Sequence, residues 1–139
     1  MQVNIVQYDQ DAEPLIRHIR DEVFIQEQGI DPDIEFDGLD NQAVHTVIIV
    51  DGEPAATGRM LSDGHIGRVA VKKAYRGSGI GAKVVSSLIE YAASHDYPRV
   101  YLGAQKHAID FYTKLGFLPF GDEFVEAGIV HLSMEKCLA

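Results

Sequence analysis

The fold and chemistry of this chain are predicted from one short stretch, Arg76-Gly77-Ser78-Gly79-Ile80-Gly81-Ala82. Its three glycines let backbone N–H groups approach a ligand without interference from a Cβ atom. The pattern predicts a strand before it, over 66–71, and a helix from it, over 79–95. N–H groups at a helix start lack intrahelical partners, and the helix dipole favours negative charge there. The stretch therefore predicts a cradle for phosphate or pyrophosphate.

Charged side chains are unevenly distributed around this stretch. The 139 residues carry a formal net charge of −9, which argues against nucleic acid or an anionic membrane as the main partner. Residues 64–89 nevertheless contain no Asp or Glu and five of the 12 Lys and Arg residues, whereas residues 21–40 contain eight of the 21 acidic residues and no Lys or Arg. The first segment suits an anionic ligand, and the acidic segment favours a cationic second substrate, although both are also compatible with ordinary solvated faces.

Three kinds of glycine-rich loop that bind phosphate groups can be compared with the stretch. A Walker loop needs Lys and then Ser or Thr after its last glycine, whereas Gly81 is followed by Ala82 and Lys83. Gly77, Gly79 and Ala82 match the dinucleotide fingerprint G-x-G-x-x-A. That fingerprint belongs in an opening βαβ unit with an acidic residue about 20 positions further on, and this chain has neither. A coenzyme A transferase loop is the interpretation that remains.

The elements predicted along the chain form one domain, residues 1–139. Predicted helices cover 11–28, 79–95 and 107–115, and predicted strands cover 3–8, 44–50, 54–61, 66–71, 99–103, 117–120 and 129–134. The order β-α-β-β-β-α-β-α-β-β is typical of an α/β (α+β) fold in which helices flank a central mixed, mostly antiparallel sheet.

Two motifs resemble those of the GNAT superfamily of N-acetyltransferases, with the expected spacing and order of elements. Arg76-x-x-Gly79-x-Gly81 resembles the superfamily's pyrophosphate-binding signature, and Ala108-x-x-Phe111-Tyr112-x-x-Leu115-Gly116-Phe117 resembles its motif at a later helix. A narrower resemblance, to a subgroup of small bacterial acyltransferases, rests on Arg20-x-x-Val23-Phe24-x-x-Glu27-Gln28, Glu35-Phe36-Asp37, Asp40 and Gly128-x-x-His131-x-x-Met134.

The resemblance implies an acyl-CoA N-acyltransferase fold with acetyl-CoA as co-substrate. The pantetheine arm is expected to pair with the strand at 66–71, where a backbone N–H would stabilise the developing oxyanion. Gln105 stands where the family often has Asn. The residues expected to bind the cofactor are Val69, Ala70, Val71, Arg76, Gly77, Ser78, Gly79, Gly81, Ala82 and Gln105.

The resemblance also implies that the amine attacks the acyl carbon directly, in a ternary complex. Tyr112 occupies the position of the family's usual acid and is expected to protonate the leaving thiolate. Two residues are candidates for the base, Glu27 at the end of the first helix and His131 on the last strand. A core aromatic, a surface carboxylate and a polar-face histidine are the ordinary alternatives for these three residues.

The leading prediction is an N-acetyltransferase that acetylates a primary amine of a small molecule, with a cationic acceptor favoured by the acidic segment. The alternative is an acyl-CoA-binding sensor without turnover, and only the enzyme would release free coenzyme A when an amine is supplied. Acyl-homoserine-lactone synthases share part of the first helix pattern but are longer chains. The acceptor, the acyl-chain preference, the choice of base and the oligomeric state stay open, and family members are often homodimers.

Location and metal content are predicted from what the sequence lacks. The first ten residues lack a signal-peptide pattern, and no apolar run reaches the length of a membrane span, so a cytoplasmic protein without a membrane partner is expected. The single cysteine, Cys137, allows neither a disulfide framework nor a cysteine metal cluster, and the histidines show no metal-ligand spacing. No metal site is predicted.

Overall fold

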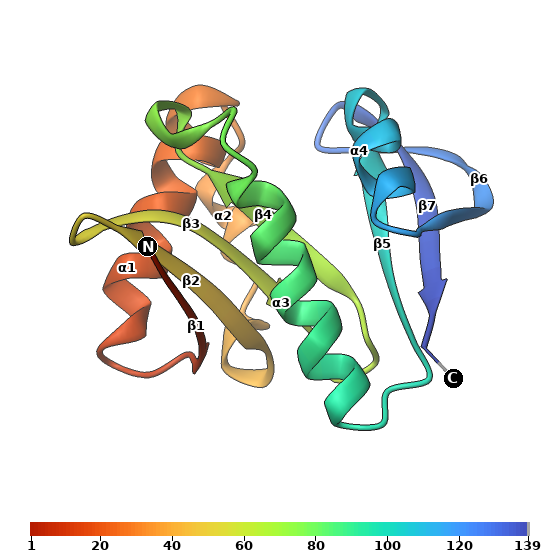
Figure 1. The fold of residues 1–139 in the computed structure, drawn as a ribbon. Coiled ribbons are helices and arrows are strands. Elements are labelled where there is room, and N and C mark those ends of the chain that lie inside the picture. Colours follow the sequence, from red (N-terminus) through yellow and green to blue (C-terminus); the bar gives the residue numbers. More distant parts are fainter. Residues whose placement is uncertain (139) are drawn as a thin grey trace.

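The computed structural model describes residues 1–138, which form two antiparallel sheets with helices packed against them (Figure 1). The strand order is β1-β2-β3-β4 in the first sheet and β5-β7-β6 in the second. The strands are β1 (Gln2–Gln7), β2 (Val44–Val50), β3 (Glu53–Met60), β4 (Ile66–Val71), β5 (Arg99–Gln105), β6 (Leu118–Glu126) and β7 (Ile129–Cys137). The helices are α1 (Ala12–Arg20), which continues as a π-helix over Asp21–Glu27, α2 (Pro32–Glu35), α3 (Ile80–Ser94) and α4 (Ile109–Lys114).

The predicted order of strands and main helices is confirmed, and the largest difference is at β6. This strand continues to Glu126 instead of ending at residue 120. Gly121 and Asp122 favour a turn in the sequence, and here the pairing of β6 with β7 shifts register between Pro119 and Glu123. Pairing with a long neighbouring strand outweighs the local preference, because strand formation depends strongly on context.

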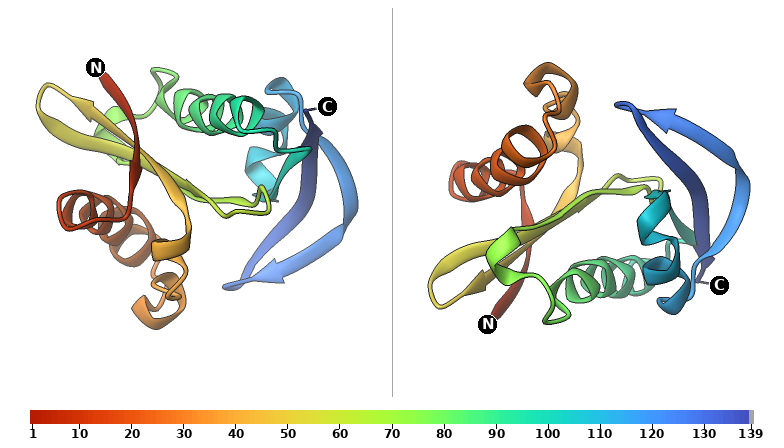
Figure 2. Two further views of the ribbon diagram at one scale, coloured as in Figure 1. Left: turned by 90° about the horizontal axis from the view of Figure 1, so that it is seen from below. Right: turned by 90° about the horizontal axis from the view of Figure 1, so that it is seen from above.

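Helices cover both faces of the first sheet (Figure 2). α1 packs against β2, β3 and β4 on one face, and α3 packs across all four strands on the other. Both helices bury apolar side chains on the face that packs against the sheet. In α3 these side chains include Ile80, Val84, Leu88 and Ala92.

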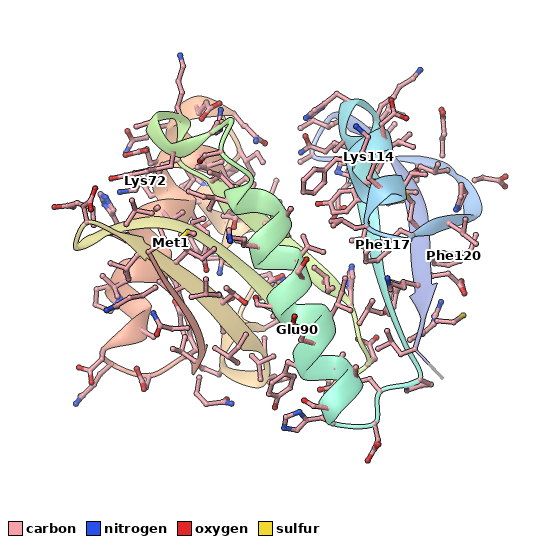
Figure 3. All side chains as sticks on the ribbon, in the orientation of Figure 1. Met1, Lys72, Glu90, Lys114, Phe117 and Phe120 are labelled. Atoms are coloured by element: carbon pink, nitrogen blue, oxygen red, sulfur yellow. The ribbon has the colours of Figure 1, made fainter. Side chains whose placement is uncertain are left out.

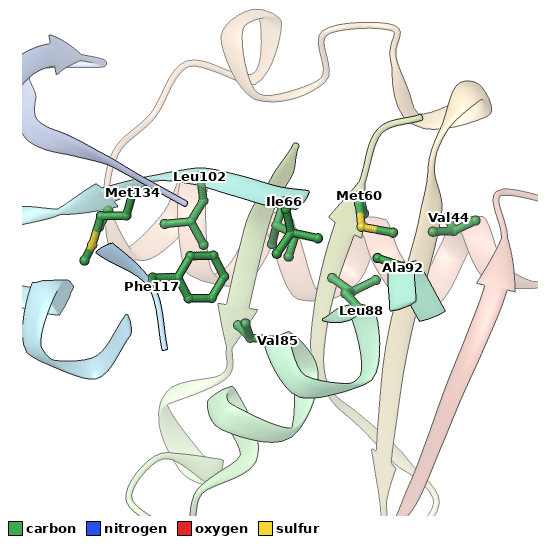
Figure 4. Packing of buried hydrophobic residues seen from close by; sticks show 11 residues of the cluster. Val44, Met60, Ile66, Val85, Leu88, Ala92, Leu102, Phe117 and Met134 are labelled. Carbon is green, nitrogen blue, oxygen red and sulfur yellow. The ribbon is translucent and has the colours of Figure 1, made fainter. Parts of the chain in front are cut away.

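The main hydrophobic cluster joins the two sheets through α3 (Figure 4). Phe117, which precedes β6, and Met134 of β7 are fully buried against residues of the first sheet and α3. The cluster consists of Val44, Met60, Ile66, Val85, Leu88, Ala92, Val100, Leu102, Ala104, Phe117 and Met134.

The two sheets meet where β4 begins and then diverge (Figures 1 and 2). The Tyr101 N–H donates to the Gly64 carbonyl oxygen at 3.0 Å, and His65 and Tyr101 form a parallel bridge. Gly64 has a φ of +93°, and a Cβ atom there would lie 2.4 Å from the Arg99 carbonyl oxygen. Only glycine therefore fits this junction. Further along, β4 and β5 separate from each other (Figures 1 and 2).

Candidate functional site

Strand β4 contains a β-bulge beside the opening between the sheets. Thr57 pairs with Ala70, but Arg59 pairs with Gly67, so β4 has one residue more than β3 over this interval. Arg68 within the bulge has a φ of +50°, a conformation that costs a non-glycine residue about 1 kcal/mol or more. A bulge leaves an extra residue outside the hydrogen-bond ladder. The strained backbone therefore marks this part of β4 as a candidate ligand contact.

The glycine loop borders a cavity of about 730 Å³, which we call the glycine-loop cavity. Gly77 and Gly79 have φ values of +89° and +80°, and Gly79 immediately precedes α3. The first N–H groups of α3 have no intrahelical partners and lie at the positive end of the helix dipole. This arrangement suits an anionic phosphate group. Eight predicted cofactor residues line the cavity: Val69, Ala70, Val71, Arg76, Gly77, Gly79, Gly81 and Ala82.

The other two predicted cofactor residues lie elsewhere. The Ser78 hydroxyl donates to the Tyr75 carbonyl oxygen at 3.2 Å and is not part of the cavity lining. Gln105, at the end of β5, lines a different cavity. His107 and Phe111 line the glycine-loop cavity instead, although sequence reasoning assigned neither to the cofactor. Phe111 lies within the second motif, which is the only signal that could have identified it.

Glu27 and Arg76 pair with each other beside the glycine-loop cavity. Arg76 Nη1 and Nη2 donate to the two carboxylate oxygens of Glu27, each at 2.7 Å, and Arg76 Nε donates to the Val71 carbonyl oxygen at 2.9 Å. The hydrogen bonds from Arg76 hold the pKa of Glu27 below its usual value. A carboxylate with a lowered pKa is a weak base. The geometry therefore favours Glu27 as the partner of Arg76.

A second cavity, of about 640 Å³, lies between β4, β5 and the β6–β7 hairpin, and we call it the interstrand cavity. Its volume is within the range typical of small-molecule sites. Val69 lines both this cavity and the glycine-loop cavity. The two cavities therefore share one residue of β4, next to the bulge at Arg68.

His131 lies in the interstrand cavity in an orientation suited to accepting a proton. Its side chain is largely buried and stacks on Phe124, with ring centroids 5.4 Å apart. Nδ1 lies 2.7 Å from the Ile129 carbonyl oxygen. A carbonyl oxygen only accepts hydrogen bonds, so Nδ1 carries a hydrogen, and Nε2 of the neutral ring has the free lone pair.

Tyr112 lines neither cavity and packs among aromatic side chains. Its ring lies edge-on to Phe111 and Phe117, with centroid distances of 5.0 and 5.8 Å. Burial raises the pKa of Tyr112 to about 12, so the hydroxyl stays protonated at neutral pH. The three predicted catalytic residues are thus not brought together: Tyr112 is in the core, Glu27 at the glycine-loop cavity and His131 in the interstrand cavity.

Three arginines neutralise three acidic residues of the acidic segment at one side of the interstrand cavity. The six side chains, which we call the charge network, are Arg20, Arg59, Arg68, Glu35, Asp37 and Asp40. Their shortest contacts are 2.6 Å, from Arg20 to Asp40 and from Arg59 to Asp37. The carboxylates that suggested a cation site are already paired with arginines, so this part of the acidic segment is not a free cation site. Sequence reasoning missed the pairing because Arg59 and Arg68 come from β3 and β4.

Among residues 1–138, no group of three or more His, Cys, Asp or Glu side chains is arranged to hold a metal ion. None of the helices formed by these residues is both long enough and apolar enough to cross a membrane.

Comparisons with known proteins identify similar chains. The family model described as "Acetyltransferase (GNAT) domain" matches residues 16–138, a range that includes both cavities. The uncharacterized N-acetyltransferase YjcF of Bacillus subtilis is 36% identical over 124 residues, which cover 86% of this chain and 88% of YjcF. An acyl-CoA N-acyltransferase from Pseudomonas aeruginosa has a similar crystal structure, with a TM-score of 0.88 at 28% identity over 99% of this chain and 100% of that one. The crystal structure of Escherichia coli ElaA gives a TM-score of 0.89 at 28% identity over 98% and 99% of the two chains.

Proposed function

The chain belongs to the GNAT acetyltransferase family and is an acyltransferase, and on that premise we propose that it transfers the acetyl group of acetyl-CoA directly to a primary amine. One observation carries the proposal: the glycine-loop cavity and the interstrand cavity are both lined by Val69, beside the bulge of β4. Two ligands can therefore be held at once, with their reacting ends at the same strand, as a ternary complex requires.

The residues of the glycine-loop cavity fit coenzyme A, which supplies an acyl thioester when bound. Gly77, Gly79 and the first turn of α3 offer N–H donors to the pyrophosphate. The edge of β4 that diverges from β5 offers backbone groups to the amides of the pantetheine arm, in the manner of an added strand. At the bulge, backbone N–H groups near Val69 would donate to the carbonyl oxygen of the thioester as negative charge develops on it.

Two side chains handle protons in this proposal. His131 accepts a proton from the acceptor amine at Nε2. Tyr112 donates to the departing sulfur, which requires its hydroxyl to turn from the core toward the glycine-loop cavity, beside Phe111. The pKa of Tyr112 is about 12, and that of a thiol is about 8.5. The hydroxyl therefore donates a hydrogen bond to the thiolate more readily than it transfers its proton to it.

A thiol-release assay tests the proposal. The chain is supplied with acetyl-CoA and a panel of primary amines, and mass spectrometry follows the acetylated products. We expect release of coenzyme A that depends on an amine and matches the acetylated product in amount. Tight acetyl-CoA binding without release from any amine would instead favour an acyl-CoA sensor.

Tyr112→Phe is expected to lower kcat by about tenfold to a hundredfold, because it removes one hydrogen bond to a developing charge. The dissociation constant for coenzyme A should stay within a few-fold, since Tyr112 does not line the glycine-loop cavity. Steady-state kinetics and calorimetry measure the two quantities. Tyr97→Phe removes the hydroxyl of another partly buried tyrosine outside both cavities and is the matched control. An unchanged kcat in Tyr112→Phe would exclude the role.

Neutralising Glu27 and neutralising Arg76 are expected to have opposite effects on the affinity for coenzyme A. Glu27→Gln removes a negative charge beside the pyrophosphate site and frees Arg76, so binding should become several-fold tighter. Arg76→Gln leaves Glu27 unpaired there and should weaken binding by about tenfold. The pair is exposed, so both variants should keep their thermal stability within a few degrees. Calorimetric titration at low and high salt measures the affinities, and equal effects in both variants would contradict this role of the pair.

We also propose that residues 1–139 act as one domain, because the main hydrophobic cluster takes residues from both sheets. Chemical unfolding should then show a single transition by circular dichroism and by tyrosine fluorescence. Light scattering would establish whether the chain is a homodimer.

A further inference from the structure

The interstrand cavity is lined mainly by apolar side chains, and aromatic rings come from three elements. Tyr101 is on β5, Phe24 is in the π-helical turns after α1, and Phe120 and Phe124 are on β6. Figure 3 labels Phe120 together with Phe117, which is fully buried just before the same strand. Phe120 and Phe124 are 44% and 36% exposed. Clustered exposed phenylalanines of this kind mark a surface that a ligand covers.

The ionic side chains at the opposite wall of the cavity are already paired. Arg59 donates to both carboxylate oxygens of Asp37, at 2.9 and 2.6 Å, and Arg68 donates to Asp37 at 3.1 Å. The three arginines and three carboxylates of the charge network balance in formal charge. A ligand ammonium that took Asp37 would have to displace an arginine and leave it unpaired, which is costly in a partly buried site. This wall therefore limits the shape of the ligand but offers no unpaired carboxylate to a ligand ammonium.

Glu126 differs from the carboxylates of the charge network because it has no arginine partner in the part of the chain that the structure describes. It lines the cavity near the β6–β7 turn, and among residues 1–138 no side chain forms a salt bridge or hydrogen bond with its carboxylate. Phe124, two residues earlier on β6, pairs directly with His131 across the hairpin. Side chains two apart on a strand share a face, so the Glu126 carboxylate and the His131 imidazole belong to the same face of the hairpin. One free carboxylate beside one base suits a single ammonium group.

From these observations we infer the class of the acceptor: a monoamine with a flat apolar body, such as an arylalkylamine. The inference rests on the proposed function, because it takes the interstrand cavity as the acceptor site. The body lies among Phe120, Tyr101 and Phe124, and the ammonium lies at Glu126. The ammonium loses one proton to His131 Nε2, and the free amine attacks the acyl carbon. The C–N bond forms as the C–S bond breaks, and the second nitrogen proton leaves with the thiolate, giving the amide and the thiol of coenzyme A.

The test compares matched amines in the thiol-release assay with acetyl-CoA. The panel contains 2-phenylethylamine, tryptamine, n-propylamine, spermidine and an aminoglycoside. We expect kcat/KM for the two arylalkylamines to exceed that for n-propylamine by about tenfold or more, because the phenyl or indole group is buried. A preference for spermidine or the aminoglycoside would overturn the acceptor class and leave the transferase standing.

Two variants locate the contacts. Phe120→Ala is expected to raise KM for 2-phenylethylamine by about tenfold and to leave KM for n-propylamine nearly unchanged. Leu118→Ala is the control, since Leu118 is exposed on the same strand and does not line the cavity. Glu126→Gln is expected to raise KM for every amine by about tenfold, whereas Glu123→Gln, which changes a carboxylate outside the cavity, should not. Equal effects of Glu126→Gln and Glu123→Gln would contradict recognition at Glu126.

Calorimetric binding of 2-phenylethylamine to the coenzyme A complex separates this inference from the proposed function. Saturable binding that Phe120→Ala weakens, without thiol release from any amine, would overturn the transfer reaction and support the ligand class. Absence of both binding and turnover with arylalkylamines would overturn the ligand class, whichever other amine reacts.

Discussion

Arg20→Met is expected to destabilise the fold by about 3–5 kcal/mol, the usual cost of removing one partner from a buried ionic pair. Arg20 is fully buried, and its guanidinium donates to Glu35 Oε2 at 2.7 Å and to Asp40 Oδ1 at 2.6 Å. It also donates to the Glu35 carbonyl oxygen at 2.9 Å. Met fills a similar volume but satisfies none of these acceptors. Urea unfolding followed by circular dichroism measures the loss.

The loss of unfolding free energy in Arg20→Met should depend on pH. In the unaltered chain the hydrogen bonds from Arg59 lower the pKa of Asp37, and for Asp40 burial raises the pKa but the bonds from Arg20 and Arg59 outweigh it. These two carboxylates therefore stabilise the fold above their unfolded pKa of about 3.9, and the contribution disappears as pH falls through the lower folded-state values.

Removing Arg20 should raise the pKa of both of its carboxylate partners, because each loses a favourable charge and hydrogen bond. Burial already raises the pKa of Glu35, and without Arg20 both Glu35 and Asp40 should titrate at higher pH. Protonation then relieves the penalty, so the difference in unfolding free energy between the two proteins should be smaller at pH 5 than at pH 8. Arg17→Met is the control, because Arg17 is exposed one turn earlier and stacks on Phe36 without an ion pair. Equal destabilisation by Arg20→Met and Arg17→Met would contradict this account. So would a difference in unfolding free energy between the unaltered chain and Arg20→Met that is larger at pH 5 than at pH 8.

Most of the fold could be predicted from the sequence because its signals are local. The helix period from residue 79 and the glycine loop each depend on neighbouring residues, and β2 and β4 have the predicted bounds. The end of β6 was not predictable in this way, because it depends on pairing with β7. The positive φ of Arg68 also has no sequence signal, since arginine does not favour that conformation.

The candidate site could be predicted only in part, for the same reason. The glycine loop is contiguous in sequence, so eight of the ten predicted cofactor residues line one cavity. The pairing of Glu27 with Arg76 joins residues 49 positions apart, and it changes how the Glu27 carboxylate is interpreted. Likewise, Glu126 was overlooked because the strand was predicted to end at residue 120, whereas β6 continues to Glu126. Phe120 lies inside the predicted strand, but no local pattern indicates that it lines a cavity.

His131→Ala is expected to lower kcat by roughly a hundredfold to ten-thousandfold, the contribution usual for a general base. The imidazole is fixed by its Nδ1 hydrogen bond to the Ile129 carbonyl oxygen and by stacking on Phe124, so Nε2 is the atom available for the proton. Affinity for coenzyme A should stay within a few-fold, because His131 does not line the glycine-loop cavity. Single-turnover kinetics with acetyl-CoA and a saturating amine measure the chemical step.

Added imidazole distinguishes a base from a structural residue, because a small base that enters the space left by His131→Ala should restore part of the rate. His18→Gln, which alters an exposed histidine on α1, is the matched control and should leave the rate unchanged. The same assay decides between the two candidate bases. If His131 is the base, Glu27→Gln retains most of the turnover, since Glu27 is held by Arg76 at the glycine-loop cavity. A large loss in Glu27→Gln, together with near-normal turnover in His131→Ala, would assign proton removal to Glu27 and require that its pairing with Arg76 open when the cofactor binds.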